Sequence, residues 1–164
     1  MTSPAYEVID SSWDMGVLPP GPLHDLHDYW KGKRGPWGLP RRRDIDPLEI
    51  PRLLKYLLLL DIETLEPLRY RVRLAGTNFR QFFGRDLTGL SVDESQLEGG
   101  LALMCRDWRE VLRLRQPRWA SIRQHVGRDG MDHVRFTGLA LPLSRDGKAA
   151  DMLLVATLYH PDRP

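Results

Sequence analysis

The sequence predicts an α+β fold in which five antiparallel strands form one sheet, helices cover one face of it, and a helical extension precedes it. Two extended segments, residues 57–62 and 70–74, are separated by a short polar turn, as in a β-hairpin. One long amphipathic helix follows over residues 101–115. Three more extended segments end the chain, and the Asp-Gly pairs between them favour tight turns; they are residues 119–126, 133–143 and 152–159.

The composition is that of one folded domain. The chain has 164 residues, 41% hydrophobic and 28% charged, and its net charge is only +2 because 24 Lys and Arg nearly balance 22 Asp and Glu. This balance does not favour nucleic acid or a membrane surface as a partner. The single cysteine, Cys105, excludes an internal disulfide, and uninterrupted apolar runs such as residues 57–60 are far too short to cross a membrane. Without a secretory signal at the start, we expect a cytoplasmic protein.

Three segments are expected along the chain. Residues 1–22 are rich in Ser, Asp, Gly and Pro, which favours a flexible, irregular arm. Residues 23–56 should form N-terminal helices that pack on the core. The first, over residues 23–33, places Leu23, Leu26, Tyr29 and Trp30 at helical spacing, and Asp46-Pro47 marks another helix start.

Residues 57–160 are expected to form the core itself. In the strand over residues 70–74, apolar residues alternate with arginines, which is typical of a sheet with one covered face. An aromatic-rich helical turn follows over residues 77–83 and is closed by Gly84. In the strand over residues 133–143 the apolar residues change parity near Gly138, which predicts a β-bulge there.

This segment order resembles a PAS domain, and several motifs are similar to those of a bacterial PAS-like family of mostly short, stand-alone proteins. The motifs are Tyr29-Trp30, residues 40–47 (Pro-Arg-Arg-Arg-Asp-Ile-Asp-Pro), Ile50-Pro51, Leu53-Leu54, Leu60-Asp61, Tyr70-Arg71, Leu74-Ala75-Gly76-Thr77 and residues 83–89 (Phe-Gly-Arg-Asp-Leu-Thr-Gly). The resemblance covers residues 23–159. It implies a sensory or protein-interaction role in signal transduction, with no assigned ligand and no catalysis of its own.

No set of residues indicates covalent chemistry or a metal. Gly84 and Gly89 have the spacing of a phosphate loop, but Leu90-Ser91 stands where Lys and Ser or Thr are required. His24 and His27 lack further ligands at a matching spacing. PAS relatives that form a flavin adduct carry a cysteine in the segment that here is residues 78–82, Asn-Phe-Arg-Gln-Phe. With no clear haem ligand either, the cofactor stays unknown, and we expect no enzyme.

An apolar pocket between sheet and helices is the first candidate site. Its candidate residues lie on the aromatic turn, the long helix and the strands: Phe79, Phe82, Phe83, Met104, Trp108, Leu112, Trp119, Ile122, Phe136 and Leu154. The alternative is that these side chains simply fill the core, since a domain of this size needs them to fold. The case for a pocket comes mainly from the family resemblance.

A second candidate site is an interaction surface. Tyr29 and Trp30 are aromatic anchors for a partner protein, and Arg41, Arg42 and Arg43 form the only basic cluster, suited to an anionic partner or simply to solvent. The leading hypothesis is therefore a non-enzymatic PAS sensor that binds a small apolar or aromatic ligand, a partner protein or both, and signals through the helix over residues 23–33. The alternative is a ligand-free adaptor that forms a homodimer or docks a regulator. An enzyme would need an acid–base pair in the cavity, and the sequence indicates none.

Overall fold

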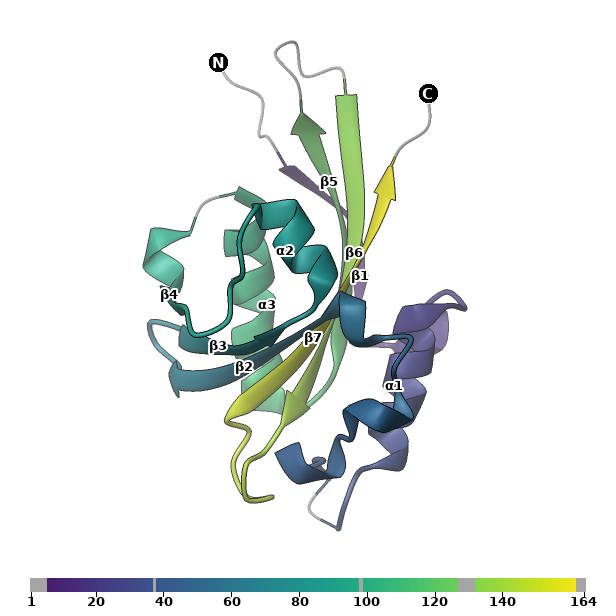
Figure 1. Cartoon of the computed structure of the whole chain (residues 1–164), viewed down its shortest axis with the longest axis vertical. Helices are drawn as coiled ribbons and strands as arrows, with labels where there is room; N and C mark the ends of the chain where they lie inside the picture. The colour runs from purple at the N-terminus through teal and green to yellow at the C-terminus, as the bar shows by residue number, and fades with distance from the viewer. Residues whose placement is uncertain (1–5, 37, 98, 127–131, 162–164) are drawn as a thin grey trace.

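A computed structural model describes residues 6–36, 38–97, 99–126 and 132–161, and in it one antiparallel sheet is the centre of the molecule (Figure 1). Its seven strands are arranged in the order β1-β5-β6-β7-β2-β3-β4. They are β1 (Tyr6–Ser12), β2 (Leu57–Thr64), β3 (Arg69–Ala75), β4 (Ser91–Asp93), β5 (Arg118–Val126), β6 (Asp132–Leu143) and β7 (Met152–Pro161). The α-helices are α1 (Pro22–Gly32), α2 (Thr77–Phe83) and α3 (Gly99–Leu114), and the 3-10 turns are η1 (Met15–Val17), η2 (Arg42–Asp44), η3 (Pro47–Glu49), η4 (Leu54–Tyr56) and η5 (Glu94–Gln96).

The five predicted strands are present, but the prediction of five in total is wrong because β1 and β4 widen the sheet to seven. Residues 6–12, which we expected to belong to an irregular arm, pair with β5 from Tyr6↔Gln124 to Ser12↔Trp119. An edge strand pairs on one side only, so its mixed polar sequence gives little periodic signal. The same holds for β4, which is only three residues long. The segment boundaries at residues 23 and 57 stay predictions.

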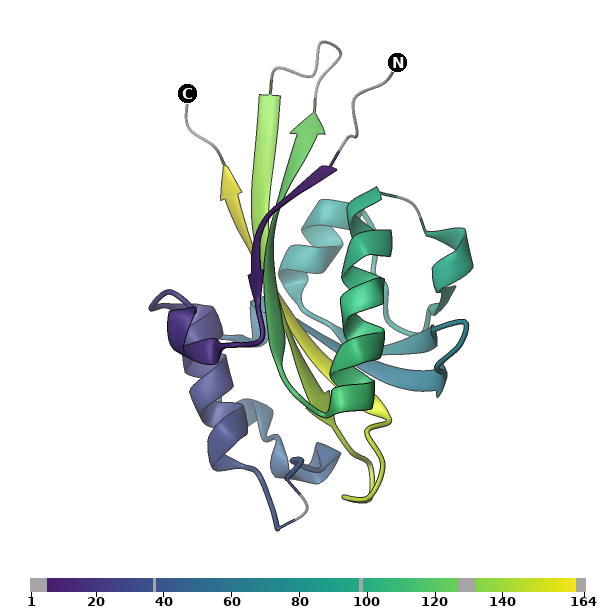
Figure 2. The ribbon, with the colours of Figure 1, turned by 180° about the vertical axis from the view of Figure 1, so that it is seen from behind.

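Helices cover both faces of the sheet, so the prediction of helices on one face is also wrong. Figures 1 and 2 show α2 and α3 on one face and α1 on the other. Strand β7 is buried on both sides: Leu153 and Val155 belong to the core under α2 and α3, whereas Leu154 and Ala156 belong to the core under α1. A strand covered on both faces is a continuous apolar run, as residues 152–156 are.

The same arrangement explains the change of apolar parity in β6. The register between β5 and β6 runs without a shift from Arg118↔Ala140 to Val126↔Asp132, so the predicted bulge at Gly138 is wrong. Phe136 faces the core under α2 and α3, and Leu139 and Leu141 face α1. A Cβ at Gly138 would lie 3.1 Å from Met104 Cε, so this glycine makes room for the side chain from α3. The Asp-Gly turn predicted at residues 129–130 lies outside the described residues.

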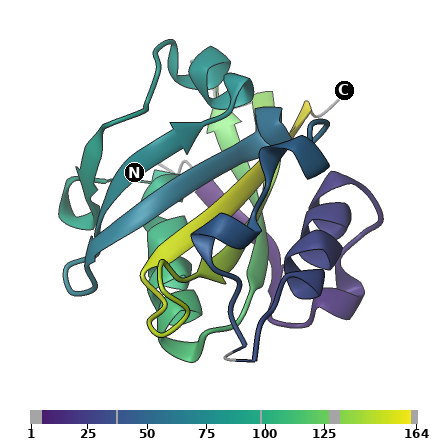
Figure 3. The ribbon, with the colours of Figure 1, turned by 60° about the horizontal axis from the view of Figure 1, so that its bottom comes forward.

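Helix α1 is firmly attached to its face of the sheet, beside the 3-10 turns seen in Figure 3. Leu26 and Trp30 are buried, and Trp30 Nε1 donates a hydrogen bond of 2.8 Å to the Pro142 carbonyl on β6. Tyr29 Oη donates to Glu49 Oε2 at 2.6 Å and accepts from the Asp46 backbone N–H at 2.9 Å. Asp46 in turn accepts from the Leu48 N–H, which confirms the predicted helix start there.

Candidate functional site

The site is a cavity of about 320 Å³ between the sheet and helices α2 and α3. This volume is at the lower end of the range of roughly 300–1,000 Å³ that small-molecule pockets occupy. Its lining is mostly apolar: Leu58, Tyr70, Val72, Phe79, Phe83, Leu87, Leu90, Val92, Leu97, Met104, Trp108, Phe136, Val155 and Tyr159, with Arg85, Gln124 and Thr157 as polar members. A small apolar or aromatic molecule fits such a lining.

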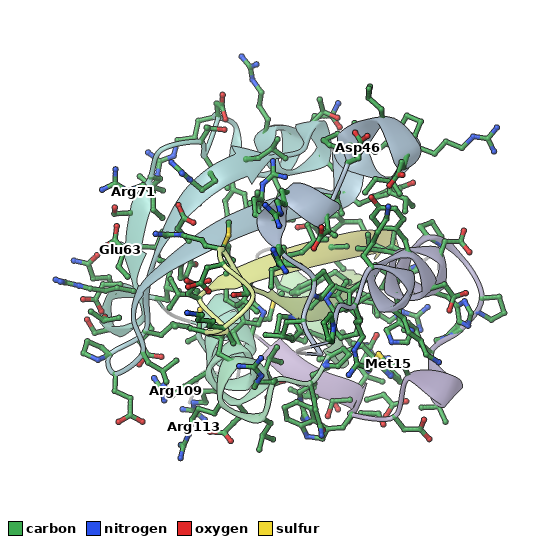
Figure 4. The ribbon with its side chains drawn as sticks, turned by 90° about the horizontal axis from the view of Figure 1, so that it is seen from below. Met15, Asp46, Glu63, Arg71, Arg109 and Arg113 are labelled. Carbon is green, nitrogen blue, oxygen red and sulfur yellow. The ribbon has the colours of Figure 1, made fainter. Side chains whose placement is uncertain are left out.

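Helical and strand periodicity place the lining side chains. On α2, Phe79 and Phe83 are four residues apart and share one face, and on α3 Met104 and Trp108 do the same. On the sheet, alternation brings Val155 from β7 to the same side. Charged side chains of β2 and β3 lie outside the lining: Glu63 and Arg71, both labelled in Figure 4, pair with 3.3 Å between Nε and Oε1.

Gly76 sets the position of α2 over the sheet. It is the N-cap residue of the helix, and its N–H donates to the Leu57 carbonyl at 2.7 Å. A Cβ at this position would lie 2.6 Å from the Lys55 carbonyl oxygen and 2.7 Å from its carbon, and closer still to the Leu54 carbonyl oxygen. Only glycine therefore allows the chain to pass so close to η4 and to begin α2 above β3.

Five of the ten predicted pocket residues line the cavity: Phe79, Phe83, Met104, Trp108 and Phe136. Leu112 and Ile122 are buried in the same core layer but lie outside the lining. The side chain of Phe82 lies outside the described residues.

Trp119 and Leu154 are in the other core, under α1, so they do not line the cavity. On β5, Trp119 and Ile122 have opposite parity, and on β7, Leu154 alternates with Val155. The prediction placed all of them on one side because it assumed a single covered face. The same assumption missed Val155, Thr157 and Tyr159, which alternation along β7 would have found once both faces were considered.

Burial disfavours the ionised forms of the two tyrosines at the cavity and of the neighbouring thiol. The pKa of Tyr159 is raised to about 12 by burial. Burial also raises the pKa of the Tyr70 hydroxyl, which shares a hydrogen bond with the Cys105 thiol. The pKa of that thiol is raised to about 12, chiefly because the group is removed from water. Since a thiolate and not a thiol is the nucleophile, Cys105 is unreactive near neutral pH.

Within residues 6–36, 38–97, 99–126 and 132–161, no group of three or more His, Cys, Asp or Glu is placed to hold a metal ion. Arg109, labelled on α3 in Figure 4, lies outside the cavity lining; it pairs with Glu94 and donates to the Leu65 carbonyl at 3.1 Å. What the cavity offers a molecule is shape, apolar contact and a few hydrogen bonds.

The predicted interaction residues range from a buried tryptophan to an exposed arginine, and three of the five are half-buried. Trp30 is only 1% exposed and is part of the core between α1 and the sheet, so it is not the surface anchor that we predicted. Burial of its large aromatic ring against the sheet stabilises the fold, so the ring is not left on the surface. Tyr29 is occupied by its hydrogen bonds to Glu49 and Asp46.

The basic cluster borders two hollows of the surface. Arg41 and Arg43 border one of about 340 Å³ together with Lys33. Arg42 borders the other, next to the buried Asp61, and its guanidinium donates to the Ile45 carbonyl at 3.2 Å.

An antiparallel sheet that encloses an apolar cavity under two helices makes this chain an α+β domain with room for a small molecule. A family model described as a PAS domain matches residues 20–156, and the chain belongs to the PAS domain family. No curated protein matches the chain. PAS domains are generally non-catalytic modules that bind small ligands and partner proteins. No helix among the described residues is long and apolar enough to span a membrane.

Proposed function

We propose that the chain is a non-enzymatic sensor that binds a small apolar or aromatic ligand in the cavity under α2 and α3. The observation that carries the proposal is unfilled space of about 320 Å³ lined by aromatic side chains. Protein interiors are packed about as densely as organic crystals, and unfilled apolar space costs stability, so a cavity of this size is kept for an occupant.

The signal passes through the sheet in this proposal. Strand β7 presents Val155 and Thr157 to the cavity and Leu154 and Ala156 to the core under α1. A ligand that changes the packing on one face therefore acts on α1 through the backbone of a shared strand. Hydrogen exchange of the α1 amides with and without the occupant tests this route, because α1 should become more protected when the cavity is filled. Equal protection in both states contradicts it.

Denaturing extraction and native mass spectrometry of the purified protein test the ligand itself. Val92 is half-buried and lines the cavity, so Val92→Phe should fill part of it and reduce a bound small molecule at least about tenfold. Val17 lies in η1 and is 57% exposed, so Val17→Phe is the matched control and should retain the ligand. If the wild type carries no small molecule and binds none from a panel of apolar and aromatic compounds, the sensor proposal fails.

The second candidate is a ligand-free adaptor that forms a homodimer, and the edge of the sheet favours it. Strand β1 pairs with β5 on one side, and its Val8 and Ile9 are 47% and 39% exposed. An exposed edge of this kind pairs readily with a second strand. Native mass spectrometry at several concentrations distinguishes the candidates, because an adaptor gives a dimer without a small molecule that Ile9→Lys converts to a monomer.

A further inference from the structure

We infer that the occupant of the cavity is a small carboxylic acid whose apolar or aromatic body lies under α2 and α3 and whose carboxylate pairs with Arg85. This inference rests on the proposed function and adds the charge and orientation of the ligand. It comes from the distribution of charge around the cavity.

Arg85 is the one charged side chain among the described residues that line the cavity. The other polar members, Gln124 and Thr157, are neutral, and burial keeps Tyr159 neutral as well. No Asp or Glu of the described part of the chain is in the lining. A cationic ligand would therefore meet one positive charge and no counter-charge, whereas a monoanion meets one partner.

The path of the chain after α2 brings Arg85 to the cavity. Gly84 ends the helix in the left-handed conformation, with φ 72°, and its N–H donates to the Arg80 carbonyl at 2.9 Å. The chain turns there, so Arg85 follows at the mouth of the cavity beside Phe83, which is 36% exposed. The arginine is exposed, so its charge stays in contact with water.

Arg85 is available for a ligand. Several other arginines already have acidic partners: Arg71 pairs with Glu63, and Arg118 pairs with Asp107. Within the described part of the chain, no side chain or carbonyl forms an ion pair or hydrogen bond with the Arg85 guanidinium. The adjacent Asp86 is used locally, since its carboxylate accepts from the Thr88 N–H at 3.0 Å.

Solvation fixes the orientation of the ligand. An ionised carboxylate cannot be buried cheaply among Phe79, Trp108 and Phe136, whereas at the mouth it keeps part of its water and gains a guanidinium. The apolar body then enters the cavity. The hydroxyl of Thr157, on the sheet wall, offers a neutral hydrogen bond to one further polar group.

Isothermal titration calorimetry at neutral pH with three probes of one shape tests the inference: 3-phenylpropanoate, 3-phenylpropan-1-ol and 3-phenylpropylamine. We expect the acid to bind most tightly and the amine most weakly. Arg85→Gln should weaken binding of the acid about tenfold and leave that of the alcohol within about twofold. Arg80→Gln is the matched control, because Arg80 is an exposed arginine on α2 outside the cavity lining, and it should change neither.

The outcomes separate this inference from the proposed function. If the acid and the alcohol bind equally, or if Arg85→Gln weakens both to the same extent, the cavity binds ligands but the carboxylate assignment is wrong. Preference for the amine also overturns it. The carboxylate assignment and the sensor proposal both fail if none of the three probes binds and Val92→Phe does not change the amount of co-purified small molecule. Equal melting temperatures of Arg85→Gln and the wild type confirm that the variant is folded.

Discussion

Among the glycines whose surroundings the structure describes, replacement of Gly76 by alanine should damage this domain most. The new Cβ would meet backbone atoms of η4, 2.6 Å from the Lys55 oxygen and 2.7 Å from its carbon. Contacts under 3.0 Å are essentially never seen for a Cβ, and the atoms here belong to the main chain, so no side-chain rotation relieves them. Either η4 or the start of α2 has to move.

The cost follows from what has to shift. Overpacking a well-packed core costs typically about 1–3 kcal/mol, and displacement of backbone belongs at the upper end, so we expect Gly76→Ala to lower the free energy of unfolding by about 3 kcal/mol. A shift of this backbone would also disturb the hydrogen bond from the Gly76 N–H to the Leu57 carbonyl, which is 2.7 Å long. Because α2 carries Phe79 and Phe83, binding of a probe in the cavity should weaken together with stability.

Urea unfolding followed by circular dichroism measures the effect, with Gly32→Ala as the matched control. Gly32 is the last residue of α1, and no atom lies within 4 Å of the Cβ that alanine would add. Alanine there should leave stability unchanged or raise it by up to about 1 kcal/mol. If the two variants unfold at the same urea concentration, the close approach of Gly76 to η4 is not what fixes α2.

Two further changes test other parts of the fold. Trp30→Phe removes the N–H that donates to the Pro142 carbonyl, so it should lower the free energy of urea unfolding by about 1–3 kcal/mol. Leu48→Ala is the control, because the Leu48 side chain is 86% exposed and its loss should change that free energy very little. The second concerns pH: the Cys105 thiol has a pKa raised from 9.0 to about 12 in the folded chain, so its contribution to stability is complete below pH 9 and is lost as the pH rises through about 12. Cys105→Ala should therefore lose less stability than the wild type between pH 8 and pH 10.5, by about 1 kcal/mol or more; equal losses contradict burial of the neutral thiol.

The sequence predicted the local structure well wherever periodicity is strong. The aromatic turn over residues 77–83 is α2 with the same bounds, and the helix over residues 101–115 corresponds to α3. The helix over residues 23–33 corresponds to α1. Each has an apolar stripe at helical spacing and a breaker after it, so local physics alone determines it.

Local periodicity could not predict that helices cover both faces of the sheet. Two-sided burial makes both parities of a strand apolar, and in β6 this pattern is the same as the one that a bulge at Gly138 would produce. The unshifted register between β5 and β6 and the packing of α1 on the second face, through Trp30, distinguish the two. Strand β1 was missed because an edge strand with one partner needs no apolar alternation.

For the candidate site, the sequence located its helical wall and not its sheet wall. Phe79, Phe83, Met104 and Trp108 follow from helical spacing and line the cavity. Whether such residues fill a core or leave a space depends on how close two elements approach, and that distance is set by contacts distant in sequence, such as Gly76 against η4. Arg85 reaches the mouth only because Gly84 turns the chain after α2.

A crystal structure of the protein purified from cells, without added ligand and then soaked with 3-phenylpropanoate, tests the central claim most directly. We predict electron density for a small molecule between Phe79, Trp108 and Phe136, from the purified occupant or from the probe. The carboxylate of the probe should lie within hydrogen-bond distance of the Arg85 guanidinium. A cavity closed by the side chains of α2 and α3, with no density in either crystal, would contradict the sensor proposal and favour the adaptor.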